Sequence, residues 1–277
     1  MNNLHSPKNN FSLALGGGGA RGLSHIGVIR RFEELWMKPS HIAGTSMGAI
    51  IGALYALGKT SHEMEEIIQK IRMAKLIDID FKKGLLKGKK VTAFLDDIFW
   101  GVDFSETKTS LQIVATEFDT GKKKVFTTGS ISAAVRASIW LPGVFTPYEY
   151  EGITYVDGWL VNNLPIEMLP NSRVIAVSAL RDISRKIEYT RNLLSFEIPL
   201  GLVGNSYSIL QKTIDIMLSQ NEERSRNSRP DIFYIHPKYT NLDYYEFHKY
   251  KKFIQAGYEA SAGLEEYMWG GCSKISW

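Results

Sequence analysis

The pattern that decides the fold stands at Ile42-Ala43-Gly44-Thr45-Ser46-Met47-Gly48. It reads Gly-x-Ser-x-Gly between a short apolar run and a helix-forming run, which predicts a serine on a tight turn from a strand into a helix. The flanking Gly44 and Gly48 leave room for the neighbouring chain and tolerate a strained backbone. Ser46 is then either a nucleophile that stands clear of the sheet or an ordinary cap of the following helix.

The residues around this turn alternate between strand and helix patterns. Strands that alternate with helices predict an α/β fold, in which a central, mostly parallel sheet is flanked by helices. The helix after the serine is rich in glycine and alanine, so it can lie close to the sheet. The expected elements of this opening are a strand over 11–15, a glycine loop over 16–22, a helix over 23–35, a strand over 40–43 and a helix over 47–57.

The rest of the chain continues the pattern, without a repeat or a linker that would divide it. The periodicity is poor over 181–208, which predicts either a loosely packed cover over a site or ordinary core. The further expected elements are helices over 63–71 and 92–99, a strand over 111–116 with a hairpin return over 124–127, a helix over 131–138, strands over 153–156 and 174–178, a helix over 209–226, a strand over 232–236 and a closing helix over 253–268.

A basic stretch interrupts the helical region before residue 92. Its lysines, which surround apolar residues, predict either a solvated loop with a buried anchor or a patch that rests on an anionic lipid surface. The sequence favours the solvated loop. The lysines are Lys82, Lys83, Lys87, Lys89 and Lys90, and the apolar residues are Phe81, Leu85 and Leu86.

The composition bounds the class of protein. The 277 residues are 44% hydrophobic and 22% charged, as expected for one large globular domain. A net charge of +4 without a concentrated basic face argues against nucleic acid. The single cysteine, Cys272, a polar stretch over 1–10 and the lack of a run of ~20 apolar residues predict a cytoplasmic protein, with peripheral membrane contact left open.

Two other segments can form a site with Ser46. Consecutive glycines at Gly17, Gly18 and Gly19 let backbone N–H groups point together, and such a loop can bind an anion or a developing oxyanion. Asp157 ends a strand and is followed by Gly158, so a loop can present it at the edge of the sheet. The six histidines are scattered without ligand spacing, and the sequence predicts neither a metal nor a cofactor.

The glycine loop also fits a nucleotide-binding pattern. The run from Gly17 to Gly22 satisfies G-x-G-x-x-G between a strand and a helix, which is the dinucleotide fingerprint. That fingerprint needs an acidic residue at the end of the second strand, where Ile42-Ala43-Gly44 stands. A phosphate-binding loop would need a lysine where Leu23 stands. A nucleotide-binding module is therefore a distant alternative.

Three ordered blocks resemble the bacterial patatin-like phospholipase family over about 13–178. They are Gly17-Gly18-Gly19-Ala20-Arg21-Gly22, Gly44-Thr45-Ser46-Met47-Gly48, and Asp157-Gly158 followed by Leu160-Val161-Asn162-Asn163-Leu164-Pro165. The resemblance implies a patatin-type single domain with a catalytic core over 11–180 and a helical portion over 181–277 that completes it. The closing stretch Ala256-Gly257-Tyr258-Glu259-Ala260 is also similar to C-terminal helices of bacterial members.

The resemblance implies a serine lipid acyl hydrolase that acts on lipid or other acyl esters. Ser46 corresponds to the nucleophile and Asp157 to its partner in a Ser-Asp dyad. The glycines 17–19 correspond to the oxyanion hole, while Arg21, Gly44, Gly48 and Gly158 are supporting residues. Trp159 departs from the family, which has glycine or alanine there, and a large ring at this position either narrows the site or points outward.

Three alternatives remain open on the sequence, and the nucleotide-binding module described above is the first. The second is an esterase with a catalytic triad and another substrate. His236 and His248 follow Asp157, so a Ser-His-Asp triad is formally available. His25 is expected to be a packed or capping histidine. A family member that has become a non-catalytic interaction protein, or one with a different specificity, is the third alternative, and Trp159 is the feature that supports it.

Overall fold

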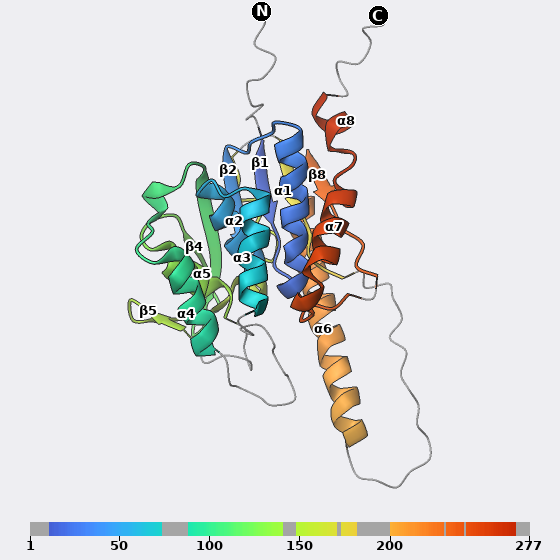
Figure 1. Ribbon diagram of the computed structural model, residues 1–277. Coiled ribbons are helices and arrows are strands. Elements are labelled where there is room, and N and C mark those ends of the chain that lie inside the picture. Colours follow the sequence, from blue (N-terminus) through green and yellow to red (C-terminus); the bar gives the residue numbers. More distant parts are fainter. Residues whose placement is uncertain are drawn as a thin grey trace, which may run out of the picture.

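One mixed sheet organises the chain. The computed structural model describes residues 11–73, 88–140, 148–170, 173–181, 200–229, 231–240 and 242–269, so the basic stretch before residue 88 and the segment 182–199 lie outside the described residues. The eight strands have the order β5-β6-β3-β2-β1-β7-β8, and β4 pairs with β3 (Figure 1). They are β1 (Ser12–Leu15), β2 (His41–Thr45), β3 (Ser110–Glu117), β4 (Lys123–Phe126), β5 (Tyr148–Tyr150), β6 (Ile153–Asp157), β7 (Val174–Val177) and β8 (Ile232–Ile235).

The sheet has a parallel part and an antiparallel part. Strands β3, β2, β1, β7 and β8 run parallel to one another. Strands β4 and β6 pair antiparallel with β3, and β5 pairs antiparallel with β6. The expected α/β fold with a mostly parallel sheet is confirmed.

The pairing of β3 explains how distant residues meet. One edge of β3 pairs with β4, and its other edge pairs first with β2 and then with β6. Thr45, the last residue of β2, pairs with Val114, and Asp157, the last residue of β6, pairs with the next residue, Ala115. Because β2 runs parallel to β3 and β6 antiparallel, the two strands meet end to end. Ser46 follows Thr45, so this topology brings Ser46 and Asp157 together across 111 positions of sequence.

Helices cover one face of the sheet with large apolar side chains. In β1 the side chains of Leu13 and Leu15 enter the main core, while Ala14 enters a second, smaller core on the opposite face, as the period of two in a strand requires. In Figure 1, α1, α2, α3 and α7 lie in front of the sheet, and α1 packs against both α3 and α7. These helices are α1 (Ser24–Glu34), α2 (Met47–Ala56), α3 (Ser61–Met73) and α7 (Tyr250–Ala260).

Two further helices, α4 (Gly88–Phe99) and α5 (Ile131–Ser138), pack against each other beside the antiparallel part of the sheet. A short 3-10 turn, Gly19–Leu23, leads from the glycine loop into α1. The hairpin expected after residue 116 and the helix over 131–138 are both confirmed. Strand β5 was not predicted, because three residues are too few to show an alternating pattern.

Three expected helix boundaries were wrong. Helix α4 starts at Gly88, four residues before the helix expected over 92–99, so Lys89 and Lys90 of the basic stretch belong to its first turn. Helix α6 spans Leu200–Asn227, nine residues longer at its start than the helix expected over 209–226. Gly201 and Gly204 disturb the apolar pattern there without preventing a helix, and Pro199 stands just before it, where proline is tolerated. The closing helix is divided into α7 and α8 (Leu264–Trp269), because Ser261 Oγ donates to the Tyr258 carbonyl and a turn follows.

The C-terminal part of the chain joins the same sheet and packs on the same helices. Strand β8 extends the parallel part beyond β7, and α7 packs along α1. Helix α6 leaves the body of the molecule at one end, as Figure 1 shows, and its second half packs inward through Leu218, Glu222 and Ser225. The elements after residue 200 therefore form part of the surroundings of the site described next.

Candidate active site

The Ser46 turn has the strained geometry that its sequence predicts. Ser46 has φ 55° and ψ −123°, a region that residues other than glycine rarely occupy. A β-carbon on Gly44 would collide with the Gly48 carbonyl, and one on Gly48 would collide with the Leu15 carbonyl. The two glycines are thus required by close contact between α2 and the ends of β1 and β2. Strain of this kind persists only where the surrounding structure imposes it.

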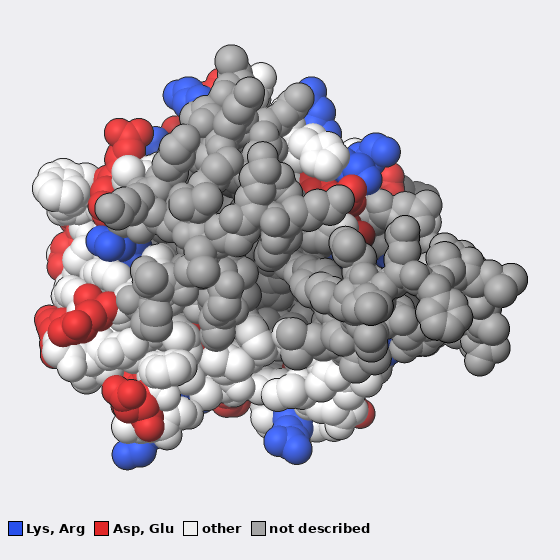
Figure 2. Space-filling model, turned by 90° about the horizontal axis from the view of Figure 1, so that it is seen from below, with Lys and Arg blue, Asp and Glu red and all other residues white. Residues whose placement is uncertain are grey.

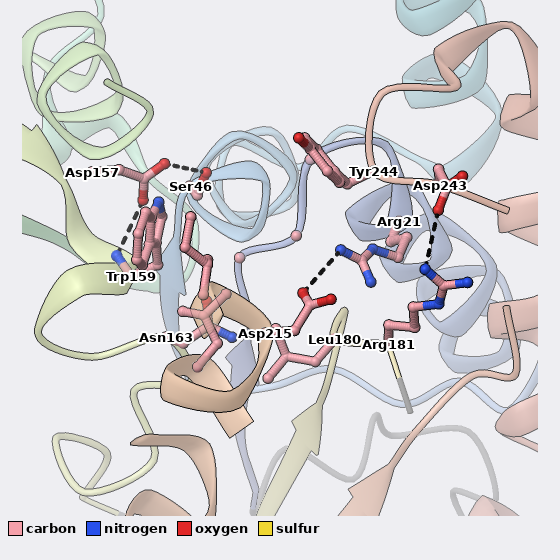
Figure 3. Close-up of a pocket in the computed structure, with 15 residues that line it drawn as sticks. Arg21, Ser46, Asp157, Trp159, Asn163, Leu180, Arg181, Asp215, Asp243 and Tyr244 are labelled. Atoms are coloured by element: carbon pink, nitrogen blue, oxygen red, sulfur yellow. Dashed lines mark hydrogen bonds and ion pairs between the residues drawn. The ribbon is translucent and has the colours of Figure 1, made fainter. Parts of the chain in front are cut away.

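The Ser46 side chain makes no cap of α2. Its Oγ instead donates a hydrogen bond of 2.7 Å to Asp157 Oδ2 (Figure 3). The capping alternative is therefore wrong. Ser46 is 8% exposed and Asp157 is fully buried, so the serine reaches the cleft while the carboxylate lies behind it.

The environment of Asp157 favours its neutral form. Its Oδ1 accepts a hydrogen bond of 3.1 Å from the Trp159 backbone N–H, which orients the carboxylate. Burial raises the pKa of Asp157 from 3.8 to about 7, although the hydrogen bonds from Ser46 and Trp159 act in the opposite direction. Loss of hydration outweighs both bonds because, among the residues that the structure describes, no cation acts on this carboxylate. A carboxylate with this pKa can gain and lose a proton near neutral pH.

The end of α5 holds the backbones of both residues. The Ser46 N–H donates to Ser138 Oγ at 2.8 Å, and the Asp157 N–H donates to the Trp140 carbonyl at 2.8 Å. Ser138 is fully buried, so water does not compete for this contact. The segment 138–140 therefore links the serine turn to the end of β6. No pattern in the sequence pointed to Ser138.

The three glycines of the loop differ in whether their backbone N–H groups already donate a hydrogen bond. The Gly17 N–H donates to the Asn163 carbonyl at 3.1 Å. Within the described part of the chain, the N–H groups of Gly18 and Gly19 have no backbone acceptor. Gly18 lies so close to Ala179 that a β-carbon would collide with the Ala179 carbonyl. The loop thus passes beside Ser46 with two backbone donors available.

The segment after Asp157 joins the glycine loop to α6. Besides the Gly17 contact, Asn163 Nδ2 donates to Glu222 Oε2 at 3.1 Å, and Tyr234 Oη donates to Glu222 Oε1 at 2.6 Å. On the other side, Thr45 Oγ1 donates to the Asn162 carbonyl. Asn163 and Glu222 are almost fully buried. Asn162 and Asn163 belong to the third block that resembles the family, but their connecting role was not expected from the sequence, and Glu222 was not anticipated.

A cleft opens at Ser46 and Asp157 and runs past the glycine loop. It encloses about 810 Å³ of space free of protein atoms, including its open mouth. One part of its wall is apolar, and Trp159 lines it together with side chains of α6. Trp159 was expected either to narrow the site or to point outward. Its ring borders the cleft, so the outward orientation is wrong (Figure 3). The apolar lining is Trp159, Leu180, Ile214 and Leu218.

The other end of the cleft carries charges of both signs. Arg21 lies 4.0 Å from Asp215, and Arg181 lies 3.5 Å from Asp243. The Arg21 guanidinium is 5.7 Å from the centre of the Tyr244 ring. Burial lowers the pKa of Arg21 and raises that of Asp215, which the neighbouring opposite charges partly counteract. Arg21 was expected as a supporting residue, whereas the other four were not anticipated.

Among the described residues that line the cleft there is no histidine. His25 is fully buried, its Nε2 lies 2.8 Å from the Gly16 carbonyl, and burial lowers its pKa to about 4, so it packs under the glycine loop as expected. His236 Nε2 contacts the Leu180 carbonyl at 3.0 Å and lies outside the cleft lining. Within the described ranges, no group of three or more His, Cys, Asp or Glu side chains could hold a metal.

The described surface shows mixed charge. On the face seen in Figure 2, the coloured Lys and Arg side chains are interspersed with Asp and Glu around the periphery. Among the helices that the structure describes, none is both long and apolar enough to cross a bilayer.

Comparison with known proteins points to one family. Residues 13–170 match the family model described as patatin-like phospholipase. An uncharacterised NTE family protein of Mycobacterium tuberculosis is 36% identical over 158 residues, which cover 56% of this chain and 44% of that protein. A lysophospholipase of Kluyveromyces lactis is 27% identical over 278 residues, which cover 89% of this chain and 18% of that protein.

The fold has a solved counterpart. The crystal structure of VipD from Legionella pneumophila superimposes with a TM-score of 0.53 at 14% identity, covering 94% of this chain and 67% of that one. The chain thus spans less than half the length of the curated relatives that it matches. Residues 13–170, which match the family model, contain both Ser46 and Asp157.

Proposed function

This chain belongs to the patatin-like phospholipase family, and from that premise we propose that it is a serine hydrolase of lipid acyl esters, of the phospholipase A, lysophospholipase or esterase kind. The observation that carries the proposal is the 2.7 Å hydrogen bond from Ser46 Oγ to Asp157 Oδ2 at the floor of the cleft. A serine that only capped a helix would use its oxygen as an acceptor for backbone N–H groups. Here the hydroxyl hydrogen points at a buried carboxylate.

In the proposed reaction, Ser46 Oγ attacks the ester carbonyl and Asp157 Oδ2 takes the hydroxyl proton. The carbonyl oxygen becomes an oxyanion, which the N–H groups of Gly18 and Gly19 stabilise. The protonated Asp157 then gives its proton to the leaving alcohol. A water molecule attacks the acyl-enzyme and gives a proton to Asp157. When the second tetrahedral species collapses, Asp157 returns this proton to the leaving Ser46 Oγ, which releases the fatty acid and restores the serine hydroxyl.

The raised pKa of Asp157 supports this role. A carboxylate with an ordinary pKa of ~3.9 is a weak base, whereas a pKa of about 7 is matched to proton transfer near neutral pH. The Gly17 N–H was expected to be one of the oxyanion-hole donors, and we propose a structural role for it instead. Because it already donates to the Asn163 carbonyl, it holds the loop in place while Gly18 and Gly19 act as the donors.

The proposal extends to the surroundings of the catalytic core. We place that core in residues 11–180, completed by 181–277 through the pairing of β8 and the packing of α7. We also propose a cytoplasmic protein that touches lipid surfaces peripherally. Exposed apolar side chains adjoin cleft residues in sequence and support this contact: Leu160, Ile216 and Met217.

Labelling with a fluorophosphonate tests the function. Such a probe reacts with an activated serine, so mass spectrometry of the digested protein should find the adduct on Ser46. Ser46→Ala should remain unlabelled. Labelling of wild type at a different serine, or none at concentrations that label other serine hydrolases, would contradict the proposal.

A further inference from the structure

The charged end of the cleft has an unusual composition for a site that binds a lipid ester. Two arginines and two aspartates line it (Figure 3). One pair joins the turn after the glycine loop to α6, and the other joins the segments that follow β7 and β8. A subsite for a purely anionic group would gain nothing from two carboxylates, because like charges repel. A subsite for an uncharged group would leave four partly dehydrated charges facing it. The four residues are Arg21, Arg181, Asp215 and Asp243.

Arg21 is the most buried of the four charges and has the least complete partner. Its side chain is 6% exposed, and its contact with Asp215 is 4.0 Å long, beyond hydrogen-bond range. Within the described part of the chain, its buried Nε has no hydrogen-bond partner. Burying a guanidinium that keeps an unpartnered N–H group is costly, and an oxyanion in the cleft would supply a charged acceptor beside it. Planar guanidinium groups are well suited to phosphate.

Asp215 and Asp243 provide the complementary half. Asp215 is 22% exposed and projects from α6 toward Arg21, while Asp243 is 41% exposed beside Arg181. The arginine contacts of the two carboxylates are 4.0 and 3.5 Å long. Arg181 and Lys212 also act on Asp215 at longer range. Asp243 accepts a hydrogen bond from Tyr245 Oη at 3.4 Å, yet both carboxylates stay partly exposed to the cleft. A cationic group that entered with the phosphate would therefore meet two carboxylates at its far side.

From this arrangement we propose that the charged end of the cleft is a subsite for a zwitterionic head group that carries both a phosphate and an ammonium. Arg21 and Arg181 bind the phosphate, and Asp215 and Asp243 bind the ammonium and select against head groups without one. The subsite lies on the far side of the glycine loop from Asp157 (Figure 3). The apolar wall with Trp159 and Leu218 takes the acyl chain. This assignment rests on the proposed function, since it gives the head group of that substrate.

Binding to a Ser46→Ala protein tests the subsite without turnover. Three lipids with the same short acyl chain are compared below their micelle concentrations: a lysolipid with phosphocholine, one with phosphoglycerol, and a monoacylglycerol. The phosphocholine lipid should bind about tenfold more tightly than either of the others, an effect in the range of partly buried charge pairs. Free phosphocholine should bind much more weakly than the lysolipid. If it binds equally well, the site belongs to a soluble zwitterion and the head-group assignment is wrong.

Substitutions in the same background identify the selecting residues. Asp215→Asn should reduce the preference for phosphocholine over phosphoglycerol to about twofold, because the ammonium loses a carboxylate while the phosphate keeps both arginines. Asp243→Asn, at a more exposed position, should act in the same direction and serves as a second variant if Asp215→Asn misfolds. Glu223→Gln removes the same charge from an exposed position of α6 outside the cleft lining, and it should leave the preference unchanged.

Two results would overturn the inference. One is equal affinity of the Ser46→Ala protein for the phosphocholine and phosphoglycerol lipids. The other is a preference that survives in both aspartate variants. Neither result bears on the hydrolase itself, because Ser46-dependent labelling by the fluorophosphonate tests that separately.

Discussion

The two ends of the cleft are built differently. At one end, Ser46 and Asp157 are held through backbone hydrogen bonds to the segment 138–140 and by direct pairing of their strands with β3. At the other end, charged side chains from the glycine loop, α6 and residues near 181 and 243 meet through contacts of 3.5–4.0 Å. The first end depends on sheet topology and the second on the orientation of long side chains.

This difference indicates a division of labour. Proton transfer needs its atoms within hydrogen-bond reach, and a displacement of about 1 Å can cost about 100-fold in rate. Recognition of a head group tolerates looser geometry, because charges act over longer distances. Substitutions at the Ser46 end should therefore change catalysis strongly, whereas those at the charged end or along the wall should change substrate preference.

The largest effect is expected from Ser46→Ala. Without the hydroxyl there is no covalent intermediate, so hydrolysis of p-nitrophenyl esters should fall by ~10⁴-fold or more. Ser110→Ala, which changes an exposed serine at the start of β3, should keep wild-type turnover. Circular dichroism checks that both proteins are folded. Turnover by Ser46→Ala near the wild-type rate would exclude Ser46 as the nucleophile.

Asp157→Asn should be nearly as damaging to activity. The amide cannot accept the Ser46 proton, and loss of a general base typically costs ~10²–10⁴-fold. In wild type, kcat/KM should rise with pH and level off above about 7, because Asp157 must be ionised to act as a base. A profile that instead rises near pH 4, or a folded Asp157→Asn with unchanged turnover, would remove Asp157 from this role.

The same substitution should have the opposite effect on stability. The folded-state pKa of Asp157 lies at about 7, above its ordinary value of 3.8, so its stabilising contribution is present below pH 4 and is lost as pH rises through 7. The neutral amide escapes this loss. At pH 8 the free energy of unfolding of Asp157→Asn should thus exceed that of wild type by a few kcal/mol, on the order of the pKa shift. This difference, measured by thermal unfolding, should shrink toward pH 4. An equal difference at both pH values would contradict the buried-charge argument.

Histidine variants separate the dyad from a triad. His236→Ala should retain activity within a few fold, because His236 contacts the Leu180 carbonyl and not Ser46 or Asp157. His248→Ala should behave alike, since His248 lies outside the cleft lining. In a triad the loss of the histidine would match the loss of the serine. A folded histidine variant as inactive as Ser46→Ala would therefore require a different base.

The sequence anticipated the Ser46 end far better than the charged end. Ser46, Asp157 and the glycine loop stand at the ends of strands, where local turn patterns are readable. The parallel pair β1 and β2 brings the loop and Ser46 to one edge, and the antiparallel β6 ends beside them. Arg181, Asp215 and Asp243 carry no such pattern, because they depend on how α6 and the last loops fold back over the sheet. Ser138 could not be predicted from the sequence either, since a buried hydroxyl that accepts one hydrogen bond from a backbone N–H belongs to no periodic pattern.

Ser138→Ala should give an intermediate effect that sharpens the contrast between the ends. The Ser46 N–H would lose its acceptor, the strained turn would relax, and kcat should fall by ~10- to 100-fold with little change in KM. Ser138→Cys retains a weak acceptor and should fall between wild type and Ser138→Ala. The pH dependence should keep its midpoint, because Asp157 is untouched. If Ser138→Ala lowered only the melting temperature and left kcat intact, Ser138 would be purely structural.

The smallest effect, a change of preference, is expected at Trp159. Its backbone N–H orients Asp157 Oδ1, and its ring borders the cleft, so the two contributions can be separated. Trp159→Ala and Trp159→Gly both keep the N–H and remove the ring. Since a narrower wall disfavours longer chains, both variants should raise kcat/KM for long-chain p-nitrophenyl esters relative to short-chain ones by a few fold, about 1 kcal/mol.

The rate on short-chain esters calibrates the Trp159 test. The Trp159 N–H that donates to Asp157 Oδ1 is kept in both variants. If this hydrogen bond, and not the ring, supports catalysis, Trp159→Ala should hydrolyse short-chain esters at nearly the wild-type rate. Trp159→Gly is the less strict test, because glycine also makes the backbone more flexible. Trp100→Ala removes a ring that is 79% exposed and outside the cleft lining, and it should leave the chain-length profile unchanged. An unchanged profile in both Trp159 variants would mean that acyl chains do not pass this wall. Selection of the chain would then have to reside elsewhere along α6, with Ile214 and Leu218 as the next side chains to vary.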